Sequence, residues 1–225
     1  MLHTARTFLR RDAAGVTVEF VAIFPAFLLV TFFIFEIIVA ILTIGTVEKA
    51  AQLGARLAIV SDTVATGVPA INTRVNSNVR FGTPCSTAST CNNFGTLVCD
   101  GNSSTGCVTT TATYPCGNTA QTPLNYIVCR MRSISSSIQA SNVTIIYKYV
   151  GLGYAGGPIA PSVTVLIGSK AGTPWSATTS TATAIPFAAL VTTILARATG
   201  SHALTNLPTV SVTMTGEDLS SAGAS

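Results

Sequence analysis

The sequence predicts an α+β protein. A long amino-terminal transmembrane helix is followed by an exported domain, in which a helix packs on an antiparallel sheet beside disulfide-rich loops. Three observations predict this class. Only 9% of the 225 residues are charged and 48% are hydrophobic, whereas an ordinary soluble domain is about 25% charged. One long apolar run follows a short basic segment near the start. Later β-branched and aromatic runs follow one another without alternating with helices, as antiparallel strands do.

The apolar run, residues 20–44, is long enough to cross a membrane. A helix of this length spans about 37 Å, and the hydrocarbon core of a bilayer is about 30 Å thick. A cleaved secretory signal has a shorter apolar core of about 7 to 15 residues. The basic residues Arg6, Arg10 and Arg11 precede the run. By the positive-inside rule we expect the N-terminus in the cytoplasm and the rest of the chain outside it.

The helix is predicted to continue beyond the membrane, from about Val16 to about Val60. In the stretch "VEKAAQLGARLAIV" polar residues at i, i+4 spacing lie on one face and small or apolar residues on another. Pro25 is expected to kink the helix, because proline lacks a backbone donor and crowds the preceding turn. Gly54 indicates either close approach of another backbone or simple tolerance. The polar line is Glu48, Gln52 and Arg56, and the other face is Val47, Ala51, Gly54 and Ala58.

These residues carry a resemblance to a known family. The stretch "GVTVEF", followed by Pro25, Glu36 and "AAQLGARLAIVSD", resembles the N-terminal signature of the TadE-like pseudopilins of the tight-adherence (Flp) pilus system. The resemblance implies that a prepilin peptidase removes the basic leader, normally after a glycine, and leaves a glutamate at the fifth mature position. Cleavage after Gly15 makes Glu19 the fourth mature residue, and cleavage after Ala14 makes it the fifth. Both sites stay open.

The two acids of the apolar run need separate explanations. A carboxylate at the edge of lipid is expensive, since an acid at the centre of the membrane costs about 2.5 to 3.5 kcal/mol even by the milder scales, so Glu19 is expected to have a partner unless it lies in the wet interface. The resemblance implies that this partner is a freed α-amino group and that Glu19, followed by Phe20, sets register during assembly. Glu36 lies roughly 25 Å further along the axis. We expect it to be protonated or to contact another transmembrane helix, and the contact is favoured over a proton pathway.

The expected organisation is a cytoplasmic leader at residues 1–15, a transmembrane and extended helix at 16–61, and an extracytoplasmic domain at 62–225. All cysteines fall in the last part, within loops spanning 81–129 that hold few large apolar residues. An even number of cysteines in an exported region predicts disulfides, which are expected to replace a core there. Spacing leaves the pairing open among about 15 arrangements. The six are Cys85, Cys91, Cys99, Cys107, Cys116 and Cys129.

The domain's elements follow from local patterns. "TPLNYIVCRMRSISSSI" predicts an amphipathic helix, with proline near its first turn and an apolar stripe of Leu124, Ile127, Val128, Met131, Ile134 and Ile138. "NVTIIYKYV", "PSVTVLIG" and "LPTVSVTMTG" predict strands. "PFAALVTTILARA" fits helix or strand, and helix is preferred. Together with the resemblance, this arrangement is expected to be pilin-like in outline.

Motifs for chemistry are weak throughout. "GLGYAG", residues 151–156, matches a nucleotide-binding pattern, but Gly157, Pro158 and Pro161 follow where a helix would have to begin, so a loop between strands is expected. "EDLSSAGAS" resembles a metal-adhesion motif but has Ala222 in place of its second serine. The cysteines have no CxxC spacing, and neither His3 nor His202 lies near them, which disfavours zinc and a redox dithiol. No metal, cofactor or catalytic residue is predicted, and no basic patch indicates nucleic acid.

The sequence therefore predicts a structural protein, a TadE-like minor pilin or pseudopilin of the bacterial inner membrane that acts by helix packing. Its expected partners are the inner membrane, other Tad/Flp pilins and pseudopilins and, if it is processed, a prepilin peptidase. A second hypothesis is an adhesive module at a pilus tip or cell surface, in which the disulfide-braced loops bind a surface or glycan. A signal-anchored extracytoplasmic enzyme is the third hypothesis and the least favoured, because the required acid, base or metal groups are lacking.

Overall fold

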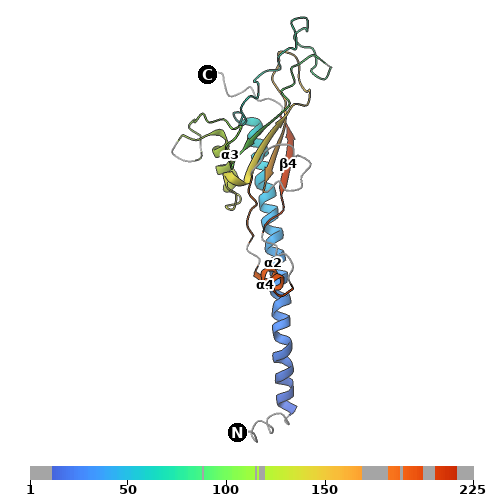
Figure 1. Ribbon diagram of the computed structural model, residues 1–225, viewed down its shortest axis with the longest axis vertical. Coiled ribbons are helices and arrows are strands. Elements are labelled where there is room, and N and C mark those ends of the chain that lie inside the picture. The colour runs from blue at the N-terminus through green and yellow to red at the C-terminus, as the bar shows by residue number, and fades with distance from the viewer. Residues whose placement is uncertain are drawn as a thin grey trace. The chain divides into compact units, whose positions relative to one another are not determined.

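The computed structural model describes residues 12–87, 89–114, 116, 120–168, 182–187, 190–199 and 206–216. Their order is helix α2 (Asp12–Val60), strand β1 (Thr96–Asp100), helix α3 (Pro123–Arg132), the short 3-10 helix η1 (Ala140–Asn142), strands β2 (Val143–Lys148) and β3 (Ser162–Ile167), helix α4 (Leu190–Thr199) and strand β4 (Val210–Thr215) (Figure 1). A long helix followed by an antiparallel sheet with further helices confirms the α+β class.

The chain divides into two compact units. The helix unit comprises Met1–Leu42 and Phe187–Thr205, and the sheet unit comprises Thr43–Pro186 and Asn206–Ser225. Helix α2 contributes to both. The division at residues 15 and 61 that the sequence suggests is a division by compartment and stays a prediction.

Helix α2 begins at Asp12, earlier than the predicted start at Val16, and ends at Val60 as predicted. The earlier start follows from Ala13 and Ala14, because alanine has the highest intrinsic helix propensity. The helix continues through Pro25. At its end, the Ser61 backbone N–H and hydroxyl both donate to the Leu57 carbonyl, at 2.8 and 2.6 Å. These bonds satisfy one of the carbonyls that a helix end leaves without an internal partner.

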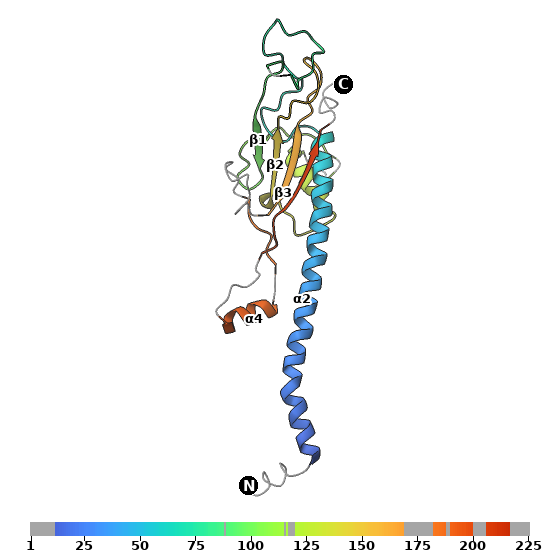
Figure 2. The same cartoon turned by 90° about the vertical axis from the view of Figure 1, so that its right-hand side faces the viewer.

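The four strands form one antiparallel sheet in the order β1-β2-β3-β4 (Figure 2). The three predicted strands are confirmed as β2, β3 and β4. Strand β1 corrects a prediction, because its residues were expected to belong to the cysteine-rich loops. It is short and lies at the edge of the sheet, where it pairs Cys99 opposite Ile145. Its stability therefore depends on β2, which no local pattern reveals.

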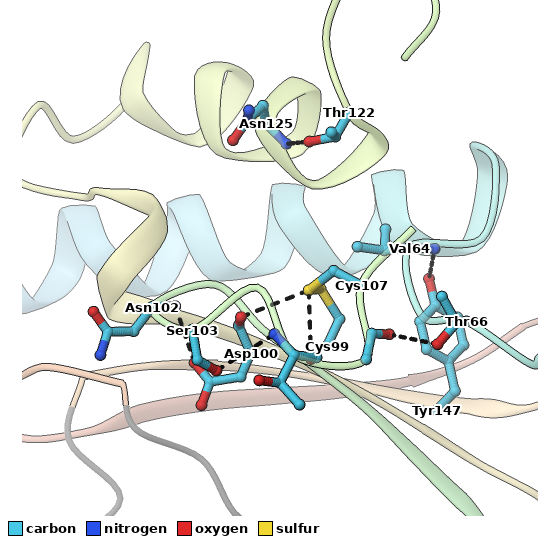
Figure 3. Close-up of a disulfide and its surroundings, with 12 residues drawn as sticks. Val64, Thr66, Cys99, Asp100, Asn102, Ser103, Cys107, Thr122, Asn125 and Tyr147 are labelled. Atoms are coloured by element: carbon cyan, nitrogen blue, oxygen red, sulfur yellow. Dashed lines mark hydrogen bonds between the residues drawn. A yellow bond between two sulfur atoms is a disulfide. The ribbon is translucent and has the colours of Figure 1, made fainter. Parts of the chain in front are cut away.

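The core of the sheet unit lies between one face of the sheet and two helices. Side chains alternate along a strand, so Val143, Ile145 and Tyr147 share a face, and all three are fully buried. Tyr147 contacts the end of α2. Helix α3 also packs on α2, with Met131 against Gly54. Figure 3 shows α2 and α3 on the same side of the strands.

Helix α3 is confirmed, but it ends at Arg132, before the last two residues of the predicted stripe. Thr122 caps its start by accepting a hydrogen bond from the Asn125 backbone N–H at 3.3 Å. Beyond the end, Ile134 is 40% exposed and Ile138 is buried outside the helix. The reason lies in the "SISSS" run, because serine hydroxyls bond locally and compete with helix continuation. The Ser133 hydroxyl, for example, donates to the Arg130 carbonyl at 2.6 Å.

The cysteines form three disulfides, Cys85–Cys91, Cys99–Cys107 and Cys116–Cys129. The first lies in a small cluster with Ala155 and the partly buried Val79 and Tyr149. The second ties β1 to the loop that follows it (Figure 3). The third ties a loop to α3. Each bridge links cysteines that are neighbours in sequence, so each closes a short loop and braces one local segment.

Candidate functional site: an apolar helix with two acids

The first half of α2 presents its large apolar side chains outward. In α2, the exposed ones are Val18, Phe20, Val21, Ile23, Phe24, Phe27, Leu29, Val30, Phe32, Phe33, Ile34, Phe35, Ile37, Ile38, Val39, Ile41, Leu42 and Val60. Exposed apolar area on this scale marks a membrane or a protein partner. Among the described residues, one helix is long and apolar enough to cross a membrane, and it includes this stretch.

The hydroxyl group inside this stretch is bonded locally. The Thr31 hydroxyl donates to the Phe27 carbonyl at 2.8 Å, one helical turn back. A hydroxyl that is satisfied within its own helix can enter lipid at little cost, because no donor is left unpaired. Thr31 therefore adds little to the free-energy cost of placing the apolar stretch in lipid.

Glu19 lies at the amino-terminal end of the apolar stretch. Its side chain is exposed, and it makes no hydrogen bond or ion pair with any other residue that the structure describes. The next residue, Phe20, stacks on Phe24 with ring centroids 5.3 Å apart. Pro25 directly follows Phe24. Gly15 and Ala14, the residues of the expected cleavage site, lie within the helical backbone of α2.

Glu36 has a different environment. Its side chain is half-buried, and its carboxylate accepts a hydrogen bond from the backbone N–H of Val191, in the first turn of α4. Both residues belong to the helix unit. We expected protonation or a contact with another transmembrane helix, whereas the bond that the structure contains is to a helix of the same chain. A carboxylate at a helix N-terminus is favourable, because it satisfies a free N–H and complements the helix dipole.

The structure does not bring the two acids together. They remain on one continuous helix, seventeen residues apart, which corresponds to roughly 25 Å. One is exposed and the other is held by α4. They cannot act as a pair on one substrate or ion.

The second half of α2 packs into the sheet unit. Its buried face consists of small and β-branched residues, Val47, Ala50, Ala51, Gly54, Ala55 and Ala58. A Cβ at position 54 would lie 2.7 Å from Met131 Sδ, so Gly54 admits a side chain of α3. We expected either close approach of another backbone or simple tolerance of glycine at this position, whereas the neighbour of Gly54 is the Met131 side chain. Arg56 lies on the exposed face.

Sequence reasoning missed the residue that joins α2 to the sheet. The Tyr147 hydroxyl donates to the Ala58 carbonyl at 3.0 Å. It also accepts from the Val64 backbone N–H at 3.3 Å, the bond drawn in Figure 3. Burial raises the pKa of Tyr147 well above its usual value. The only sequence signal was a tyrosine at an inward position of a strand, and a buried tyrosine usually has a hydrogen-bond partner.

A second tyrosine anchors the segment after α2. The Tyr114 hydroxyl donates to Asp62 Oδ2 at 2.8 Å, and its ring stacks on Tyr126 of α3 with centroids 4.8 Å apart. Burial, and then the bond to Asp62, raise the pKa of Tyr114 to about 12. Asp62 is the residue at which the composition of the chain changes, so this contact connects the helix end to the loops and to α3.

The loops around Cys85–Cys91 carry exposed aromatic residues. Phe81 is 70% exposed and Tyr154 is 58% exposed. They line a shallow groove of about 640 Å³ together with Gly82 and residues 155–157. The Arg74 guanidinium lies 4.1 Å from the centre of the Phe81 ring. The "GLGYAG" stretch forms one side of this region as a loop between β2 and β3, as expected from its sequence.

Within the part of the chain that the structure describes, no group of three or more His, Cys, Asp or Glu residues could hold a metal ion. His3, His202 and the "EDLSSAGAS" segment lie outside the described residues. The described residues of α2 present an apolar surface with two separate carboxylates along it.

Comparison with known proteins bears on this helix. The model of a family described as "TadE-like protein" matches residues 15–56, which cover most of α2 and contain both acids. No curated protein and no solved structure matches the chain.

Proposed function

We propose, on the premise that residues 15–56 match the TadE-like family, that this chain is a membrane-anchored minor pilin or pseudopilin that takes part in assembling a tight-adherence (Flp) pilus. Anchoring in a membrane fits both the match and the apolar helix. The proposal adds three points: a role in assembly, location in the inner membrane, and other Tad/Flp pilins as partners.

The observation that carries the proposal is the exposed apolar surface of α2 between residues 18 and 42. A bilayer covers such a surface in the free subunit. In an assembly, helices of neighbouring subunits replace the lipid, and van der Waals packing together with interhelical hydrogen bonds drives their association. Packing of this kind requires no catalytic group.

Glu19 gives this packing its register. It is a carboxylate at the membrane edge with no polar partner among the described residues of its own chain. A charge in that place is costly until it is paired. An α-amino group freed by cleavage of the leader, on the same or a neighbouring subunit, supplies the opposite charge. Because the two charges pair at one stagger of the helices, they select that stagger over its neighbours.

The proposal predicts that the leader is removed. In bacteria that express the chain with a prepilin peptidase, the intact mass should correspond to a protein lacking residues 1–14 or 1–15. In cells without the peptidase the full-length 23.1 kDa chain should persist. The mass also decides between Ala14 and Gly15 as the residue that precedes the cut.

The matched control is Glu48→Gln, because Glu48 is an exposed acid on the same helix outside the apolar run. This variant should be processed like the original chain. A full-length chain in both strains would contradict processing and leave an uncleaved membrane anchor.

A second candidate function rests on the exposed aromatic groove. Phe81 and Tyr154 present their rings on loops braced by the Cys85–Cys91 disulfide. Rigid exposed aromatics beside an arginine are typical of a binding surface. This region would make the chain an adhesive module for a surface or a glycan, at a pilus tip or on the cell.

The double replacement Phe81→Ser with Tyr154→Ser separates the two functions. If the groove is adhesive, attachment of cells to a surface should fall while the number of pili stays unchanged. The control is Ile134→Ser, an exposed apolar residue beyond the end of α3. A parallel loss of pili, or attachment equal to that of the control, would rule out a separate adhesive role.

A further inference from the structure

The connection between β3 and β4 contains an apolar stretch that belongs to the helix unit. Residues Phe187–Thr205 are part of that unit, whereas the residues on both sides belong to the sheet unit. The two flanks are joined by the bridge Pro186↔Asn206 and by the Leu207 N–H donating to the Ile185 carbonyl at 3.0 Å. Between these flanks the only ionisable residues in the sequence are Arg197 and His202. A stretch of this composition is unusual for a solvated loop, since loops are normally polar.

Helix α4 within this stretch is attached to α2 by its N-terminus. The Val191 N–H donates to the Glu36 carboxylate, and Val191 is 3% exposed. Figure 2 shows α4 extending from α2 across the direction of the α2 axis. The N–H groups of a first helical turn lack partners inside their helix. In water they would be solvated, but in lipid an N–H group without a hydrogen-bond partner is strongly unfavourable. A cap from Glu36 is therefore most valuable where water is scarce.

The position of Glu36 gives the depth of this contact. Glu19 marks the inner edge of the apolar run, and Glu36 lies seventeen residues beyond it on the same helix. That separation is roughly 25 Å of a hydrocarbon core about 30 Å thick. Val191 then lies about 5 Å inside the outer boundary, at the level where amphipathic helices parallel to a membrane bury their apolar face, about 5 to 10 Å deep.

We propose that α4 is an interfacial helix, which lies in the plane of the outer membrane–water boundary with its apolar face in lipid. The sequence "LVTTILARAT" places apolar residues at i, i+1, i+4 and i+5, one face of a helix. On this face Val191 is covered where α4 meets Glu36, whereas Ile194 is 53% exposed and available to lipid. Arg197, also exposed, has a stem long enough to carry its charge to the headgroups. The partner is lipid because α4 joins α2 within the apolar run itself. The chain thus has a second contact with the bilayer, held to the first by Glu36.

This inference rests on the proposed membrane anchor, and the experiment distinguishes the failure of each. The full chain is used with its single tryptophan, Trp175, replaced by phenylalanine. One new tryptophan is introduced at a time, as Ile194→Trp on the apolar face, Thr193→Trp on the exposed polar face, or Phe27→Trp in the apolar run. Each variant is reconstituted into phospholipid vesicles that contain lipids brominated near the headgroup end or near the methyl end of the acyl chains.

The tryptophan of Ile194→Trp should lose roughly half of its fluorescence to bromine near the headgroup end and much less to bromine near the methyl end, as expected for a helix with one face in lipid. The Thr193→Trp variant should lose markedly less with either lipid. The Phe27→Trp variant should be quenched by bromine near the methyl end. Adding Glu36→Leu to Ile194→Trp should reduce its quenching, because the cap is lost, whereas Glu36→Gln keeps an acceptor oxygen and should preserve it.

The inference is overturned if Ile194→Trp escapes quenching while Phe27→Trp is quenched, and the anchor then still stands. An Ile194→Trp emission that is shifted to shorter wavelength yet unaffected by brominated lipid also overturns it, since protein and not lipid would cover α4. If neither position is quenched, the membrane anchor itself fails and the inference fails with it.

Discussion

Alanine in place of Tyr147 is expected to lower the free energy of unfolding of the sheet unit by about 3 to 5 kcal/mol, the range for deleting a large buried aromatic side chain. The side chain is fully buried. Its loss creates a cavity between β2 and α2, and it leaves the Val64 N–H and the Ala58 carbonyl without the partner that joins them. Urea unfolding of the full chain in detergent micelles, followed by circular dichroism, measures the change.

The hydroxyl can be tested apart from the cavity. Tyr147→Phe preserves the ring and should cost about 1 to 3 kcal/mol, because it leaves buried polar groups unsatisfied. Tyr149→Phe is the matched control in the same segment, at a half-buried tyrosine that packs edge-on against Phe94, and should change stability by less than about 0.5 kcal/mol. Equal stability of the two phenylalanine variants would show that the hydroxyl does not join α2 to the sheet.

Replacing Glu19 with leucine is expected to reduce filament assembly by at least about 30-fold. This corresponds to the loss of about 2 kcal/mol, somewhat less than the roughly 2.5 kcal/mol that the milder scales give for an acid at the centre of the membrane. Leucine makes the helix more apolar, so insertion into the membrane should be retained. The measurement is the ratio of subunit in sheared pili to subunit in the membrane fraction, by quantitative immunoblotting.

Glu48→Gln again serves as the control, since it removes an exposed acid outside the apolar run and should leave the ratio unchanged. Glu19→Asp, which keeps the charge on a shorter side chain, should recover part of the assembly. If Glu19→Leu assembles as well as the control, the glutamate lies in the wet interface and sets no register.

The main elements were predictable because their signals are local. Strands β2 and β3 are continuous runs of β-branched and aromatic residues, and α2 is an apolar run too long for a soluble helix. Strand β1 was missed because its few residues, with Cys99 among them, lie in a segment that otherwise reads as loop. The end of α3 was placed too late because periodicity continued into Ile134 and Ile138, while the serine-rich run that begins at Ser133 ends the helix at Arg132.

The residues of the candidate site likewise divide into those that the sequence reveals and those that it does not. Glu19, Pro25 and Glu36 could be selected from the sequence, because an acid or a proline in an apolar run stands out without any knowledge of the fold. The partner of Glu36 could not be selected, since Val191 lies 155 residues away along the chain. The role of Tyr147 was equally hidden, with its acceptor Ala58 at a separation of 89 residues.

The sequence alone determined that this chain has a long apolar helix with two acids, an α+β domain and enough cysteines for disulfides, because composition and periodicity are properties of neighbouring residues. Only the tertiary structure decided how the cysteines pair, which strand completes the sheet edge, what holds α2 to the sheet, and that Glu36 caps α4. Apart from the disulfides, which join consecutive cysteines and whose pairing the spacing left open, those contacts join residues that are distant in sequence, and they form only once the chain has folded and brought them within bonding distance.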